Sequence, residues 1–234
     1  MLRETIKSKS KSKTSKNQNT MKTVYNLIIV DESGSMCLIE QQAFAGMNET
    51  IQTVQQLQKK YPDIEQRITL MTFETGKRRY HLDNVTAQQA TILAPGQYRP
   101  GGGTPLYDAV GEGIAKVNAV CGVDDEVVVT IITDGEENSS VEYNHKMVKN
   151  LIEKMKKQGW TFAFIGTDNL DVSGMAQSLG IDSHLSFSED AAGTQMMFER
   201  VRSCREANMA CIASDESDEQ RAYRRANFLN LDEK

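Results

Sequence analysis

An unbroken apolar run, Leu27 to Val30, leads directly into the polar sequence Asp-Glu-Ser-Gly-Ser at residues 31–35. An apolar run without polar alternation predicts a strand that is covered on both faces, as in a parallel sheet. In open α/β sheets, ligands bind at the carboxyl ends of the strands. The sequence therefore predicts a parallel sheet with small oxygen-bearing side chains at its binding edge.

The rest of the chain alternates between helical and strand patterns. Residues 38–60 lack proline and have apolar side chains at helical spacing, and further helices are expected over residues 105–120, 141–158, 172–179 and 191–208. Strands are expected over 67–74, within 125–138, over 160–168 and over 184–187, with 78–85 as an antiparallel hairpin partner of 67–74. This alternation predicts an α/β fold, with a mostly parallel sheet, one antiparallel edge strand and helices on both faces.

Charge is unevenly distributed along the 234 residues. The formal charge is −5 for the whole chain and +6 for residues 1–22, which leaves −11 on the remainder. We expect residues 1–22 to be a disordered basic leader, because the Lys/Ser-rich sequence cannot form a core. Met21 is an alternative start of the chain. The functional alternative for the leader is binding to nucleic acid or a membrane surface. Residues 23–210 are expected to form one domain, and residues 211–234 a charged tail or frayed helix with no assigned role.

Composition argues against several classes of function. A net charge of −11 argues against nucleic-acid binding by the folded part. No apolar run reaches the ~18 residues of a membrane span, and the N-terminal region lacks the apolar segment of a signal peptide. The four cysteines are scattered, with no CxxC pair, so neither a zinc site nor a disulfide framework is indicated. We expect a cytoplasmic protein with reduced thiols.

Five oxygen-bearing side chains fall at strand ends or at a helix start. They are Asp31, Ser33 and Ser35 after the first strand, Thr104 after three glycines, and Asp134 after a later strand. Hard divalent cations such as Mg²⁺ prefer oxygen ligands of this kind. For Thr104 alone there is another role, because a threonine before Pro105 is typical of a helix N-cap.

In order and spacing these residues resemble the metal-ion-dependent adhesion site (MIDAS) of von Willebrand factor type A (VWA) domains. The matching pieces are Asp31-x-Ser33-x-Ser35, Thr104 within GGGTPLYDA, and Asp134 within IITDGEEN. The order of strands and helices agrees with that family over residues 23–208. The segment GGGTPLYDAV especially resembles stand-alone bacterial VWA proteins, including those of tellurium-resistance and stress systems. The resemblance implies a Rossmann-like, doubly wound sheet with the metal at its carboxyl edge.

The resemblance also implies a function. Mg²⁺ or Mn²⁺ would be held by the hydroxyls of Ser33, Ser35 and Thr104 and, directly or through water, by Asp31 and Asp134. Because hydroxyls add no charge, the cation would still attract an anion. The implied function is a metal-dependent protein-interaction module that binds an exposed Asp or Glu of a partner.

Neighbouring acidic residues are given other roles. Glu32 is expected to point away from the metal, and Glu136 and Glu137 to form a solvated rim that could repel an acidic partner or bind a second cation. Asp168 follows the next strand and is a candidate for indirect contact with the site.

The main alternative is a phosphoryl-transfer hydrolase with Asp31 as nucleophile. Haloacid-dehalogenase-type enzymes need a second Asp two residues later as general acid, but this chain has Ser33 there, whose hydroxyl cannot supply that proton at neutral pH. The serines also lack a G-x-S-x-G frame, and the three histidines are isolated. We therefore expect no enzymatic activity. A purely structural domain is disfavoured, because five oxygen ligands would then be needless.

Overall fold

The computed structural model describes residues 21–231. A six-stranded sheet has the order β3-β2-β1-β4-β5-β6. Neighbouring strands are parallel except for the β2–β3 pair, which is antiparallel. The strands are β1 (Lys22–Asp31), β2 (Ile64–Glu74), β3 (Lys77–Thr86), β4 (Glu126–Thr133), β5 (Thr161–Thr167) and β6 (Ser183–Phe187). This confirms the predicted α/β fold with one antiparallel edge strand.

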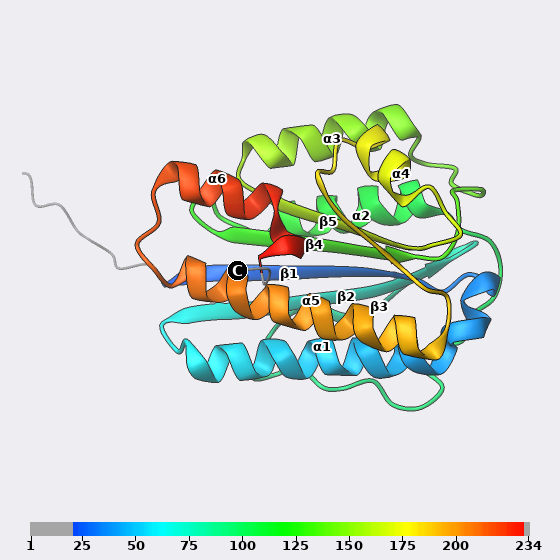
Figure 1. Cartoon of the computed structure of the whole chain (residues 1–234), viewed down its shortest axis with the longest axis horizontal. Helices are drawn as coiled ribbons and strands as arrows, with labels where there is room; N and C mark the ends of the chain where they lie inside the picture. The colour runs from blue at the N-terminus through cyan, green and yellow to red at the C-terminus, as the bar shows by residue number, and fades with distance from the viewer. Residues whose placement is uncertain (1–20, 232–234) are drawn as a thin grey trace, which may run out of the picture.

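Helices cover both faces of the sheet (Figure 1). Helices α1 and α5 pack against each other on one face, whereas α2, α3 and α4 cover the other. The helices are η1 (Gly34–Ile39), α1 (Glu40–Lys60), α2 (Leu106–Asn118), α3 (His145–Lys157), α4 (Val172–Ser178), α5 (Ala191–Ile212), α6 (Asp218–Ala226) and η2 (Phe228–Asn230), of which η1 and η2 are 3₁₀ helices. Among residues 21–231, no helix has both the length and the apolar character needed to cross a membrane.

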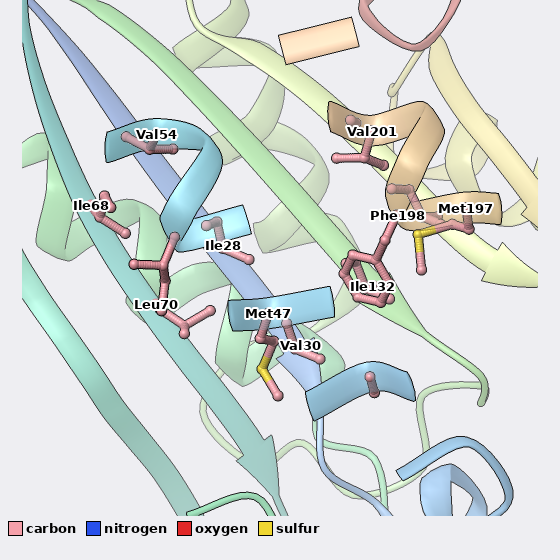
Figure 2. Packing of buried hydrophobic residues seen from close by; sticks show 14 of the residues in the cluster. Ile28, Val30, Met47, Val54, Ile68, Leu70, Ile132, Met197, Phe198 and Val201 are labelled. Atoms are coloured by element: carbon pink, nitrogen blue, oxygen red, sulfur yellow. The ribbon is translucent and has the colours of Figure 1, made fainter. Parts of the chain in front are cut away.

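The central strand β1 contributes to two separate hydrophobic cores. Successive side chains of a strand point to opposite faces, so Ile28 and Val30 pack toward α1 and α5, while Leu27 and Ile29 pack toward α2 and α3. Figure 2 shows Ile28 and Val30 among apolar side chains of β2, β4, α1 and α5. Burial on both faces explains why the sequence of β1 shows no polar alternation.

The strand order places a ligand crevice at the carboxyl edge of the sheet. β1 and β4 are adjacent and parallel, yet β1 leads into α1 on one face and β4 leads toward α3 on the other. A reversal of this kind opens a crevice between the two strand ends in doubly wound sheets. Asp31 is the last residue of β1, and Asp134 directly follows β4.

Two expectations about the elements need correction. The helix expected from residue 141 begins only at His145, because the preceding loop is hydrogen-bonded to α2 instead. The segment from residue 211, expected to be a charged tail or frayed helix, continues α5 to Ile212 and then forms α6 and η2. Phe228 and Leu229 are fully buried against α5 and the sheet, so this segment is part of the folded core.

The predicted basic leader falls almost entirely outside the described residues. Residues 1–20 are not described, and Lys22, the last residue assigned to the leader, is already the first residue of β1.

Candidate metal centre

The chain that leaves β1 folds Asp31, Ser33 and Ser35 into one cluster. Ser33 Oγ lies 3.2 Å from Ser35 Oγ, and the Ser33 backbone N–H donates to Asp31 Oδ1 at 2.7 Å. Asp31 Oδ2 accepts a hydrogen bond from Thr133 Oγ1 at 2.6 Å. Both oxygens of this fully buried carboxylate are therefore fixed by their neighbours.

Asp134 joins this cluster from the end of β4. Ser35 Oγ donates to Asp134 Oδ1 at 2.6 Å. The other oxygen, Asp134 Oδ2, is buried and has no hydrogen-bond partner among residues 21–231. A buried carboxylate oxygen without a partner is costly, and such groups call for an explanation such as a bound ion.

The hydroxyl of Thr104 lies close to the hydroxyl of Ser35, beside Gly135. Gly135 has no side chain, and a Cβ atom placed there would lie 3.1 Å from Thr104 Oγ1 and 3.6 Å from Ser35 Oγ. The two hydroxyl oxygens therefore lie next to the same residue. The alternative role for Thr104 as a helix N-cap is wrong, since α2 begins at Leu106 with Pro105 in the capping position and no side-chain cap. All five predicted ligands thus lie around one crevice.

Two loops are bound together to hold Thr104 next to Asp134. We call residues 97–104 the glycine loop; it ends at Thr104, whose backbone N–H donates to Asn138 Oδ1 at 2.8 Å. In return, the Asn138 backbone N–H donates to the Thr104 carbonyl at 3.1 Å. This reciprocal pair ties the glycine loop to the loop after β4.

Two carboxylates also connect the loop after β4 with α2. Glu137 accepts the Tyr107 backbone N–H at 2.9 Å, near the positive end of the α2 dipole. Asp108, buried in the first turn of α2, accepts the backbone N–H groups of Val141, Glu142 and Tyr143. The expectation that Glu137 belongs to a solvated rim was therefore wrong. Sequence analysis missed Asp108, for which a carboxylate in the first turn of a helix was the available signal.

The other acidic residues near the predicted ligands differ in burial. Glu32 is buried and turned away from the crevice, as predicted; its carboxylate accepts from Thr72 Oγ1 and from the Arg99 backbone N–H. Glu136 and Asp168 are exposed.

Burial shifts both site carboxylates toward their protonated forms. Desolvation raises the pKa of Asp31 to about 6, although hydrogen bonds from Thr133 and Ser33 oppose the shift. Desolvation also raises the pKa of Asp134, against the hydrogen bond from Ser35. Two negative charges held out of water in this way favour a positively charged ligand.

The donor set fits a hard divalent cation. The five side chains offer carboxylate and hydroxyl oxygens only, which suits Mg²⁺ or Mn²⁺. Within residues 21–231 no group of three or more His, Cys, Asp or Glu side chains is placed to hold a metal. Hydroxyls therefore have to supply the remaining protein ligands at a site with two carboxylates.

Comparisons with known proteins agree with this architecture. The family model of the von Willebrand factor type A domain matches residues 27–233. Comparison with curated proteins gives no match.

Several solved structures share the fold at low sequence identity. The PilB minor pilin from Streptococcus sanguinis has a TM-score of 0.59 at 12% identity, covering 85% of this chain and 64% of the pilin chain. The pilus adhesin SpaC from Lactobacillus rhamnosus GG, in its open conformation, has a TM-score of 0.61 at 15% identity, covering 82% and 31%. The vWF domain of the type V pili tip protein Mfa5 from Porphyromonas gingivalis has a TM-score of 0.55 at 11% identity, covering 85% and 99%. The chain thus spans less than two thirds of PilB and of SpaC, and these likenesses concern the fold.

Proposed function

The chain belongs to the von Willebrand factor type A domain family, and we propose that it is a protein-interaction module that depends on a divalent cation, Mg²⁺ or Mn²⁺. The proposed ligands are Asp31, Ser33, Ser35, Thr104 and Asp134. The observation that carries the proposal is Asp134 Oδ2, a buried carboxylate oxygen beside Ser35 that has no hydrogen-bond partner in the described part of the chain. When bound, the cation would supply a positive charge that can accept a further oxygen ligand.

We propose that a partner supplies that ligand from an exposed Asp or Glu. The site contains two carboxylates for a dication, and its three hydroxyls add no charge. Ser35 is exposed, so the cluster is open to solvent on one side. An anionic group of the partner would therefore complete both the coordination and the charge balance.

Binding is favoured over catalysis by the setting of Asp31. A nucleophilic carboxylate needs an open face, but Asp31 is fully buried and both of its oxygens accept hydrogen bonds. This argues against the phosphoryl-transfer alternative. We further propose a cytoplasmic protein of the stand-alone bacterial type, such as those of tellurium-resistance systems, on the basis of the Gly101–Val110 segment. Its acidic domain should bind no nucleic acid.

Metal binding is tested by thermal unfolding with millimolar Mg²⁺ and with EDTA. A cation at 100 times its Kd adds about 2.7 kcal/mol to the free energy of unfolding. For a domain of this size that corresponds to a rise in Tm of roughly 5–10 °C. Asp134→Asn, which keeps the size of the side chain but removes its charge, should lose the rise. An unchanged wild-type Tm, together with no binding in a direct Mn²⁺ titration, would contradict the proposal.

The partner mechanism is tested with a matched pair of variants at Thr104. Proteins captured by the wild type in Mg²⁺ should be released by EDTA. Thr104→Ser keeps the hydroxyl and should retain capture, whereas Thr104→Ala removes it and should weaken capture sharply. Capture that survives EDTA and Asp31→Ala would place the interaction surface elsewhere on the domain.

A further inference from the structure

We propose that Glu32 is a positioning residue for the metal site, because it holds the glycine loop against the carboxyl end of β1 and so fixes where the Thr104 hydroxyl lies. This inference rests on the proposed function, since it assigns a supporting role at the same site. Glu32 is 2% exposed and directs its carboxylate away from the crevice, so it acts through the loop rather than as a ligand.

One carboxylate oxygen of Glu32 holds the start of the glycine loop. Glu32 Oε1 accepts the Arg99 backbone N–H at 2.7 Å and Arg79 Nη1 at 3.2 Å. The same Arg79 Nη1 donates to the Gln97 carbonyl at 2.9 Å. The loop is therefore attached to Glu32 directly through Arg99 and indirectly through Arg79.

The other oxygen connects Glu32 to the sheet. Glu32 Oε2 accepts from Thr72 Oγ1 at 2.5 Å, and that hydroxyl lies 2.9 Å from His81 Nε2. Thr72 belongs to β2 and His81 to β3. The orientation of the carboxylate is thus set by two strands of the sheet, which makes it a fixed anchor for the loop.

Backbone hydrogen bonds form a second attachment between residues 32–34 and the glycine loop. The Gly101 N–H donates to the Glu32 carbonyl at 2.8 Å, and the Gly34 N–H donates to the Gly102 carbonyl at 3.1 Å. The far end of the loop is held at Thr104 by Asn138. Glu32 therefore anchors the beginning of a loop whose end carries the ligand.

Such an anchor is needed because the loop contains three consecutive glycines. Glycine has more backbone freedom than any other residue, and a loop that is free before binding loses that entropy when it supplies a ligand. Gly102 has a φ of +70°, which side-chain-bearing residues rarely adopt. The Glu32 contacts restrict this loop before the cation binds, so that less conformational freedom remains to be lost.

A double-mutant cycle between Glu32 and Thr104 tests the inference, with Mn²⁺ affinity measured by the loss of the free Mn²⁺ EPR signal. Glu32→Ala should weaken Mn²⁺ binding by about tenfold, as is common when groups that orient a metal ligand are removed. In the Thr104→Ala background the same change should cost less than about twofold, because the hydroxyl that Glu32 positions is already absent. Glu32→Gln should stay within about twofold of the wild type, since its amide oxygen can still accept the Arg99 N–H.

Three results would overturn the inference. Equal losses for Glu32→Ala in both backgrounds would show an effect that does not pass through Thr104. A loss for Glu32→Gln as large as for Glu32→Ala would show that the charge near the cation matters and the attachment does not. If wild-type protein binds no Mn²⁺, the proposed function fails and this inference fails with it, an outcome distinct from the first two.

A second variant covers the case in which Glu32→Ala does not fold. Arg79 is 44% exposed and bridges Glu32 to Gln97. Arg79→Ala alone should weaken Mn²⁺ binding. When it is added to Thr104→Ala, it should have little further effect on the Mn²⁺ affinity. Strictly additive losses in this cycle would also overturn the inference.

Discussion

Burial determines how Asp31 behaves when no cation is bound. The surroundings raise its pKa from an ordinary 3.8 to about 6, mainly by desolvation. A carboxyl whose pKa is higher in the folded than in the unfolded protein binds more protons when folded, so the free energy of unfolding falls as pH rises from about 4 to about 6. Above that window the metal-free protein carries the full cost of the buried charge.

Asp31→Asn should remove this cost. At pH 7 in EDTA we expect the variant to be more stable than the wild type by about 2–3 kcal/mol, at 1.36 kcal/mol per pKa unit. At pH 4 the difference should largely disappear, because Asp31 is then mostly protonated in the wild type. Urea unfolding of both proteins in EDTA at pH 4, 5, 6 and 7 measures it. Parallel pH profiles of the two proteins would contradict the raised pKa.

The sequence predicted which oxygen-bearing side chains would lie near one another, whereas most of the contacts that hold them in place could not be predicted. Asp31, Ser33 and Ser35 fall within five positions of each other, and the sheet brings Asp134 next to them because β4 pairs with β1. Asp108 shows the contrast, since it accepts backbone N–H groups more than 30 residues along the chain. The sequence shows that Asp108 lies in the first turn of a helix, but its contacts depend on how the loop after β4 packs against α2, which local sequence patterns do not indicate.

At the scale of the element, α6 is fixed by a buried network of charges. Arg224 is 1% exposed and donates to Glu126, Glu216 and Asn208 at 2.9–3.1 Å. Although burial pushes the pKa of Glu126 upward, Arg224 and Arg225 hold that pKa below its usual value. Through Glu126, the first residue of β4, this network docks α6 on the end of the sheet opposite Asp31 and Asp134.

Arg224→Ala should therefore be strongly destabilising. It leaves Glu216, whose side chain is 7% exposed, without its arginine partner and weakens the pairing of buried Glu126. Breaking a buried ion pair costs about 3–5 kcal/mol. Arg221→Ala is the matched control on the same helix, because Arg221 pairs with Asp218, whose side chain is 99% exposed. That change should cost less than about 1 kcal/mol. Similar urea midpoints for the two variants would show that α6 does not depend on the Arg224 network.

The same network explains why α6 was mistaken for part of a tail. Its sequence DEQRAYRRA is almost entirely polar, so no apolar periodicity marks it as packed. It packs through ion pairs, and the apolar contacts come from Phe228 and Leu229 just beyond it. In contrast, α1 and α2 carry apolar stripes and were predicted close to their observed bounds. Hydrophobic periodicity therefore identifies elements that pack with apolar side chains, and does not identify a helix that packs mainly through ion pairs.

At the scale of the whole molecule, the two ends of the chain should contribute very differently to stability. Residues 1–20 carry a formal charge of +5 and are mostly Lys, Ser, Thr and Asn. A segment of this composition has too few apolar groups to add to a core. The last 20 residues include Arg224, Phe228 and Leu229, which are buried in the domain.

Two deletions of equal length test this contrast. A chain that begins at Met21 retains β1 from Lys22 onward and should keep the wild-type Tm and the wild-type rise in Tm with Mg²⁺. A chain that ends at Ser214 loses the buried Arg224 network and the Phe228 side chain, and removal of a buried Phe side chain alone costs about 3–5 kcal/mol. Its Tm should therefore fall by at least about 6 °C, at 2–4 °C per kcal/mol, or the domain should fail to fold. Thermal unfolding followed by circular dichroism, at two salt concentrations, measures both.

The chain that begins at Met21 could instead have a Tm several degrees below that of the wild type, with the difference disappearing at high salt. That result would contradict the prediction and would show that the basic leader binds the acidic domain electrostatically and contributes to its stability.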